Sequence, residues 1–582
     1  MPPDCLPARS RDSFRDILHG LFHDRLHRRL RRSFMVVLLF GCPVAAVSAD
    51  QVGGQADERI EVRIEAPDAP AAVDGRVIVA LSRTQEFVVG DVTGSSQLFG
   101  VTVDGLARGA GVVIDATALG YPLRSLADVP PGEYWAKAWL HVYTTFERSD
   151  GHVVKLPMDQ GEGQVWHRSP GNLVSEPVRV RIGDDAVDRI VLDAVIPPIE
   201  PPAETEWVKN FRMTSPLVSE FWGRPMELGA RVLLPRGYEL DPERRYPVVI
   251  AHGHFSTAAP GGFITPAEVA DPAAPTAREA RGLALHEAWT ADDFPRFLLI
   301  TIQHPTPYYD DSYAVNSANH GPYGDAIVHE LLPAVEAEFR GIGEPWARIL
   351  TGGSTGGWEA VAQQVFYPDE FGGAWAFYPD QVDFHYYQLV DLHDGSNAYW
   401  RDYEWLRAPI PGARDADGRL RYTMEDENIW EEVRGTRSRS GGQWAAWNAT
   451  YAPVAEDGYP AALWDPLTGV IDRDVANAAI ERFDINLHLQ RNWDELAPKL
   501  AGKLNVFTGR MDNYFLEQAV YLLEDFMTTG DNVGYPARFE YGDKGPHGWS
   551  PWRNPDDPRG LYGEMMEQVR SNAPDDAGVA LP

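Results

Sequence analysis

Residues 351–358 combine one serine with four glycines in an order that suits nucleophilic chemistry. An apolar run precedes them and a helix-like pattern follows, which predicts a strand, a tight turn carrying Ser354, and a helix. Gly352 and Gly356 flank the serine because a side chain with a Cβ would collide with the strained turn. The turn would expose the serine hydroxyl and leave the N–H of Thr355 at a helix start, where it could bind an oxyanion. A glycine-rich turn with an incidental serine would look the same, so the rest of the chain must supply a base and an acid.

Two residues follow Ser354 in the order serine, acid, histidine that a catalytic triad of this type requires. Asp512 comes directly after the apolar run 504–508, and His547 lies in a Gly/Pro-rich loop after another such run. His547 could take the serine proton, and Asp512 could orient its ring. Asp380 is a competing acid, because some enzymes place the acid one strand earlier, but chain order favours Asp512. The plainer alternatives are a surface-loop histidine and an aspartate that caps the next helix.

A second oxyanion donor is expected after the apolar run 248–251, where the sequence continues as His252, Gly253 and His254. Gly253 allows a tight turn, so the N–H of His254 could point at the oxyanion. Two neighbouring histidines also suggest a metal site, but no carboxylate stands at a matching spacing in this loop. We therefore expect no metal and no cofactor.

Taken together, these motifs resemble those of the esterase D, or putative esterase, family of α/β hydrolases, which includes feruloyl and acetyl esterases. The resemblance covers about residues 225–555. It implies that Ser354 is the nucleophile, His547 the base and Asp512 the acid, with the N–H groups of His254 and Thr355 as the oxyanion hole. Thr355 departs from the family, which usually has Met at this position. The motifs that carry the resemblance are His252-Gly253, residues 352–357, Gly509-Arg510-Met511-Asp512 and Pro546-His547.

The elements that would position these residues lie between 207 and 572, where apolar strand-like runs alternate with helix-like segments. This alternation predicts an α/β fold with a mostly parallel sheet, the α/β-hydrolase fold. Residues 323–339 carry apolar side chains every four positions and should form one helix. Between about 380 and 500 the alternation stops and Trp and Tyr become frequent. We expect a cap inserted over the site, with a helical decoration remote from it as the alternative.

Residues 57–195 read differently, as short alternating strands separated by turn residues. This pattern predicts a separate all-β, sandwich-like domain, with an accessory role favoured over binding of a sugar polymer or a partner. The proline-rich residues 196–206 should form an extended linker. The polar residues 573–582 are expected to be a disordered tail.

The first 49 residues look like a cleaved export leader, with an Arg-rich stretch, the apolar run 34–40 and small residues up to Ala49. The protein is therefore expected in the periplasm or outside the cell, without a stable membrane span after cleavage. Both cysteines, Cys5 and Cys42, fall in this leader, so the mature chain would have no thiol chemistry. Lipid anchoring at Cys42 fits poorly, because Phe40 and Pro43 depart from a lipoprotein box. The formal net charge of −33 argues against nucleic acid as a partner.

The hypothesis that joins these features is a secreted serine esterase acting through an acyl-enzyme on a small-molecule or sugar-linked ester. Three alternatives remain open at this point: a peptidase of the prolyl-oligopeptidase kind, an acyltransferase, and a secreted binding protein with an inert hydrolase fold. The acyl and alcohol parts of the substrate and the oligomeric state do not follow from the sequence.

Overall fold

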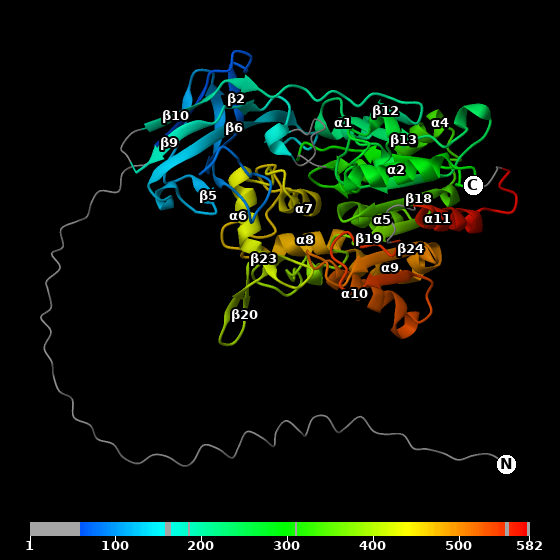
Figure 1. Cartoon of the computed structure of the whole chain (residues 1–582). Coiled ribbons are helices and arrows are strands. Elements are labelled where there is room, and N and C mark those ends of the chain that lie inside the picture. Colours follow the sequence, from blue (N-terminus) through cyan, green and yellow to red (C-terminus); the bar gives the residue numbers. More distant parts are fainter. Residues whose placement is uncertain (1–58, 158–164, 184–186, 309–310, 553–557, 579–582) are drawn as a thin grey trace, which may run out of the picture. The chain divides into compact units, whose positions relative to one another are not determined.

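The computed structural model describes residues 59–157, 165–183, 187–308, 311–552 and 558–578 (Figure 1). The expected leader, with Cys5 and Cys42, lies outside the described residues, as do the last four residues of the expected tail. Gln55–Pro582 form one compact unit. In the part of the chain that the structure describes, no helix is long and apolar enough to cross a membrane.

The central element is an eight-stranded sheet that runs through the region where strands and helices alternate. Its first two pairings, β12 with β13 and β13 with β15, are antiparallel. The remaining neighbours pair in parallel, so the carboxyl ends of six consecutive strands meet at one edge. The strands in sheet order are β12 (Val208–Thr214), β13 (Glu227–Leu233), β15 (Leu298–Gln303), β14 (Val248–His252), β18 (Arg348–Gly353), β19 (Gly373–Phe377), β24 (Leu504–Gly509) and β25 (Arg538–Gly542).

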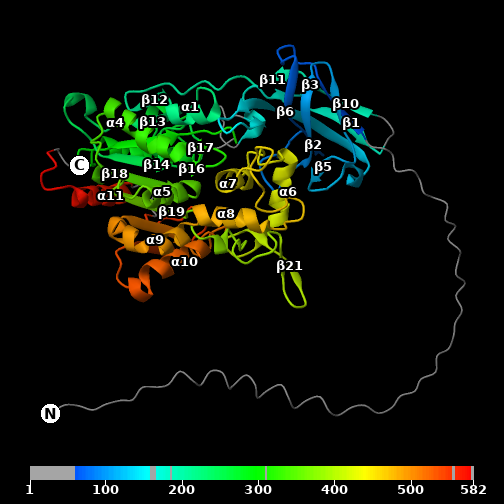
Figure 2. The ribbon, with the colours of Figure 1, turned by 180° about the vertical axis from the view of Figure 1, so that it is seen from behind.

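Helices cover both faces of this sheet, as the opposite views of Figure 1 and Figure 2 show. Successive strand residues face opposite sides, so Ile349 and Leu350 of β18 belong to two different apolar clusters. Ile349 packs with residues of α2 (Ala277–Thr290) and α11 (Arg559–Asn572). Leu350 packs in the cluster that contains α5 (Thr355–Phe366) and α10 (Glu517–Thr528).

The segment expected to be one helix over 323–339 is divided in the structure. It consists of α3 (Tyr323–Ala326), a π-helical turn (Ile327–Leu331) and α4 (Leu332–Glu338). Pro333 lies in the first turn of α4. A proline has no N–H to bond to the preceding turn, so the chain widens there instead of continuing as a regular α-helix.

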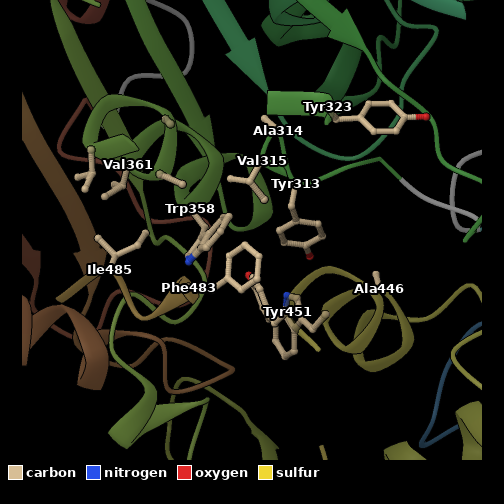
Figure 3. Close-up of a cluster of buried hydrophobic side chains, with 14 of the residues drawn as sticks. Tyr313, Ala314, Val315, Tyr323, Trp358, Val361, Ala446, Tyr451, Phe483 and Ile485 are labelled. Carbon is tan, nitrogen blue, oxygen red and sulfur yellow. The ribbon is translucent and has the colours of Figure 1, made fainter. Parts of the chain in front are cut away.

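The segment between β19 and β24 contains helices and strands that could not be assigned from the sequence. Its hairpins are β20 (Trp400–Asp402) with β21 (Arg407–Pro409) and β22 (Pro411–Arg414) with β23 (Leu420–Thr423). Its helices are α6 (Met424–Arg434), α7 (Gln443–Tyr451), α8 (Arg473–Phe483) and α9 (Ile485–Leu500). Figure 3 shows Tyr451 and Phe483 from this segment packed toward Trp358 of α5. The segment is therefore fixed to the helix that follows the Ser354 turn.

The N-terminal region is rich in β-structure, as expected, and two of its sheets share an apolar core. The smaller has the order β10-β1-β4, from Val187–Leu192, Arg59–Ile64 and Gly111–Ile114. The larger has the order β11-β8-β6-β2-β3-β5, from Ala194–Val195, Leu173–Val174, Gly132–Glu147, Ala72–Ser82, Gln97–Ala107 and Leu119–Tyr121, with β7 (Val153–Leu156) and β9 (Val178–Ile182) paired to β6.

The β-rich region also contacts helix α6. Arg76 on β2 is buried and donates hydrogen bonds to the carbonyl oxygens of Val433 and Glu432, both at 3.0 Å. These two bonds satisfy carbonyl groups near the C-terminal end of α6, where a positive charge is favourable. Residues 196–206, the expected linker, contain no helix or strand.

Candidate active site

Ser354 occupies a strained turn between β18 and α5. Its backbone angles are φ 58° and ψ −122°, in a region that residues with a Cβ rarely adopt. A Cβ on Gly352 would lie 2.4 Å from the carbonyl carbon of Gly356, and a Cβ on Gly356 would lie 2.2 Å from the carbonyl oxygen of His252. Both glycines are therefore required by close backbone approach, as the sequence pattern predicted.

His547 and Asp512 lie together at the carboxyl edge of the sheet, after β25 and β24 respectively. Nδ1 of His547 is 2.8 Å from Oδ2 of Asp512, and Asp512 is fully buried. The other carboxylate oxygen accepts the backbone N–H of Tyr514 at 2.9 Å. Asp512 does not cap α10, because that helix has Leu516 at its N-cap.

Three further residues hold the His547 ring in place, and the sequence alone gave no sign of them. The backbone N–H of His547 donates to Oδ1 of Asn513 at 3.0 Å. The rings of Tyr378 and Tyr514 meet the imidazole edge-on, with centroids 4.6 and 5.0 Å away. These contacts leave the ring little freedom to turn away from Asp512.

Asp380, the competing acid, contacts the nucleophile rather than the histidine Nδ1. Its Oδ1 accepts the hydroxyl of Ser354 at 3.3 Å, and its Oδ2 accepts the hydroxyl of Thr355 at 3.1 Å and the indole N–H of Trp447 at 3.0 Å. The side chain is buried, and loss of solvation raises the pKa of Asp380 above its usual range. Asp512 is the carboxylate that lies on Nδ1 of His547.

The two expected oxyanion donors also lie at this edge. Thr355 is the first residue of α5, directly after Ser354, so its N–H belongs to the open N-terminus of the helix. His254 follows β14 and Gly253, and its Nε2 is 3.4 Å from the Thr355 hydroxyl. The structure therefore places both residues beside the serine.

His252 has a carboxylate neighbour that the sequence spacing did not reveal. Nδ1 of His252 is 3.5 Å from Oε2 of Glu359 on α5, and Nε2 of His304 is 3.9 Å from Oε1 of the same side chain. Glu359 stands on α5, so the spacing of residues in the loop could not show this carboxylate. Nδ1 of His304 accepts the backbone N–H of Ser312 at 3.1 Å. Burial holds the pKa of His304 well below its usual range, so the ring is neutral.

A cavity of about 480 Å³ opens at Ser354 and His547. Helices α6 and α7 of the inserted segment form part of its wall, through Glu427, Gln443 and Trp447. Part of the inserted segment therefore lines this cavity, and its role as a cap stays a prediction. Burial raises the pKa of Glu427 to about 7. Among the described residues that line this cavity, none is Lys or Arg.

With this geometry in place, comparison with known proteins gives one family. Residues 222–457 match the family model described as Putative esterase. Over this segment the chain is similar to that family. The resemblance inferred from the motifs is confirmed there, with Ser354, Asp380 and the loop of His254 inside the match. Asp512 and His547 lie beyond the end of the matched residues.

The chain also resembles solved structures at low identity. A ferulic acid esterase is 16% identical, with 63% of this chain and 98% of that chain covered and a TM-score of 0.35. An S-formylglutathione hydrolase from Agrobacterium tumefaciens is 13% identical, covering 63% and 97% with a TM-score of 0.32. The fluorophosphonate-binding serine hydrolase FphF of Staphylococcus aureus is 14% identical, covering 62% and 98% with a TM-score of 0.32. A search of curated proteins found no match.

Proposed function

We propose that this protein is a serine carboxylic ester hydrolase in which Ser354 attacks the ester carbonyl. The observation that carries the proposal is the 2.8 Å contact between buried Asp512 and His547, which lines the same cavity as Ser354. A histidine held by a carboxylate at Nδ1 has Nε2 available for the serine proton. The strained turn of Ser354 presents its hydroxyl to the same cavity.

The reaction then proceeds in two halves. His547 takes the proton of Ser354 as its oxygen attacks, and returns that proton to the departing alcohol when the tetrahedral intermediate collapses. Water deprotonated by His547 next attacks the acyl-enzyme and releases the acid. The N–H groups of Thr355 and His254 stabilise the oxyanion in both halves, and each such donor contributes about 10²–10³ in rate.

The chemistry of the cavity wall narrows the substrate class. Asp380 and Glu427 place two carboxyl groups in the wall, together with the amides of Gln388 and Gln443 and the indole of Trp447. An ester that carries a carboxylate near the reacting carbonyl would meet these groups without a Lys or Arg to pair with it. We therefore propose uncharged, hydroxyl-bearing esters, including sugar-linked esters, as the substrates of this site.

A fluorophosphonate probe tests the proposal directly. The probe should attach to the intact protein, and peptide mapping by mass spectrometry should place the adduct on Ser354. His547→Ala should label at least about 10²-fold more slowly, because the hydroxyl then lacks its base. An unlabelled, folded protein would instead indicate an inert hydrolase fold with a binding role.

The proposed setting is outside the cytoplasm. The Arg-rich and apolar stretches of residues 1–49 support an exported protein whose mature chain begins near residue 50. N-terminal sequencing of the protein from periplasmic and culture fractions tests this, since an intact Met1 in the cell-associated pool would contradict cleavage.

A further inference from the structure

A second cluster of chemistry-bearing side chains lies outside the candidate active site. It consists of Asp383 and His385, which follow β19, together with His393 and Asp484. One ligand-type atom of each residue lies within 4.8 Å of those of the others. Asp383, His385 and the nearby Asn486 line an open groove of about 640 Å³.

The two carboxylates of this cluster are buried, and each is paired with one imidazole. Oδ1 of Asp383 is 2.8 Å from Nδ1 of His385, and Oδ2 of Asp484 is 2.9 Å from Nε2 of His393. The side chains of Asp383 and Asp484 are 4% and 1% exposed. Among the described residues, the ion pairs of these two carboxylates are with the histidines alone. Two buried carboxylates without a fixed cation are costly, because burial penalises uncompensated charge.

A further buried polar side chain, Asn486, hydrogen-bonds to the cluster. Its Nδ2 donates to Oδ2 of Asp383 at 2.7 Å, and the residue is 2% exposed. Its Oδ1 is buried and has no hydrogen-bond partner among the described residues. A buried acceptor of this kind is expected to have a donor or a cation beside it.

The two imidazoles lie face to face. Their rings stack with centroids 3.7 Å apart and an angle of 3° between planes. Nδ1 of His385 and Nε2 of His393 each lie beside a buried carboxylate of the cluster. Imidazole nitrogen is a common metal ligand, so the cluster offers nitrogen as well as oxygen donors.

We propose that Asp383, His385, His393 and Asp484 bind one divalent transition-metal ion, with Zn²⁺ the best fit. Two imidazole nitrogens and two carboxylate oxygens form a donor set that zinc accepts in tetrahedral geometry. Ligands about 2.0–2.2 Å from such an ion lie roughly 3.5 Å from one another, so on binding the cluster contracts and the stacked rings turn until their nitrogens converge on the ion. His385 is about half exposed, at 47%, so an ion can enter from the groove.

The position of this site gives the ion a structural role. Asp484 is the N-cap of α9, where its Oδ1 accepts the N–H of Leu487 at 2.9 Å and its Oδ2 that of Phe384 at 2.9 Å. The ion would fasten the start of the inserted segment to this helix. The fastened loop also carries Asp380 and Gln388, which line the cavity of Ser354. The inference stands independently of the proposed hydrolysis.

Metal analysis of tag-free protein tests the proposal. The protein is stripped with a chelator, dialysed separately against Zn²⁺, Mn²⁺ or Ca²⁺, and measured by plasma mass spectrometry and thermal unfolding. We expect about one zinc per chain and a melting temperature raised by about 5 °C. His385→Ala combined with His393→Ala should lose both effects, whereas His329→Ala, at an exposed position on the π-helical turn, should keep them.

The following results would count against the metal site. Wild-type protein that holds less than about a tenth of an equivalent of every ion would overturn the site. An equal zinc content per chain in the double variant and in wild type would also overturn the site. Binding of calcium alone would contradict the assignment to a transition metal. If the double variant does not fold by circular dichroism, His385→Ala alone, at the more exposed ligand, must show the loss of zinc.

Discussion

Nδ1 of His547 lies 2.8 Å from Oδ2 of Asp512, and this carboxylate is fully buried. In the proposed mechanism this contact leaves Nε2 as the nitrogen that takes the Ser354 proton, and it stabilises the ring once the ring is protonated. Asp512→Asn should therefore lower kcat by about 10³–10⁴ with little change in fold, because the amide favours the wrong tautomer. Steady-state hydrolysis of p-nitrophenyl acetate measures this. Asp543→Asn, at an exposed carboxylate in the same loop as His547, is the matched control and should retain full activity. A loss below tenfold for Asp512→Asn would rule out the assigned role.

Asp380 should behave differently from Asp512, because it contacts the hydroxyls of Ser354 and Thr355. In Asp380→Asn an NH₂ group would replace one carboxylate oxygen, and this new donor would face groups that are themselves donors. Leaving such a donor unmatched costs about 1–3 kcal/mol, which corresponds to roughly 10- to 100-fold in kcat/KM. The comparison uses the same ester assay at the same pH. A loss as large as that of Asp512→Asn would instead make Asp380 the acid of the triad.

Glu427 should make stability depend on pH. Burial raises the pKa of Glu427 from 4.5 to about 7. The folded state therefore binds this proton more tightly than the unfolded state, and its contribution to stability is lost as pH rises from 4.5 to about 7. Glu427→Gln has no such charge, so its stability relative to wild type should rise by about 1–3 kcal/mol between roughly pH 5 and pH 8. Urea unfolding at both pH values measures the difference.

The control for this prediction is Glu425→Gln on the same helix, at a partly exposed position. It should change stability by less than about 0.5 kcal/mol over the same range. A wild-type and Glu427→Gln pair whose stability difference stays constant with pH would show that this carboxyl is charged in the folded protein at neutral pH.

Gly356 should not tolerate a side chain. A Cβ there would lie 2.2 Å from the carbonyl oxygen of His252 and 2.8 Å from the N–H nitrogen of Gly253, and both are backbone atoms. Gly356→Ala should push α5 away from the loop of His254, costing about 2–4 kcal/mol of stability and at least about 10²-fold in activity. Gly563→Ala in α11, where the space is open, should instead be neutral or stabilising by up to about 1 kcal/mol. Thermal unfolding of both variants tests this difference. Equal melting temperatures for Gly356→Ala and Gly563→Ala would refute the argument that a side chain at Gly356 collides with the backbone.

Much of the sheet and the order of the candidate residues could be predicted because both follow from local sequence. Apolar runs such as 248–251 and 504–508 are strands because they are buried on both faces. Asp512 follows β24 and His547 follows the partly buried edge strand β25, and parallel strands end at a common edge. The separate β-domain and the linker remain predictions.

The cavity wall and the second cluster could not be predicted, because tertiary packing decides them. Gln443 and Trp447 are spaced as ordinary core residues of one helix turn, and only the placement of α7 brings them to Ser354. His393 and Asp484 are 91 residues apart in the chain and meet through the start of α9. One continuous helix was predicted over 323–339 because the apolar periodicity was given more weight than Pro333. In the structure the helix is interrupted just before that proline.

Hydrolysis of p-nitrophenyl acetate by wild type and Ser354→Ala tests the central claim most directly. Removing the nucleophile removes the acyl-enzyme route, so the variant should lose at least about 10³-fold in kcat/KM while keeping its circular dichroism spectrum and melting temperature. Ser571→Ala, at an exposed serine of α11, should match wild type. A wild-type rate in Ser354→Ala would contradict the account, because ester cleavage would then proceed without the serine on which the site is built.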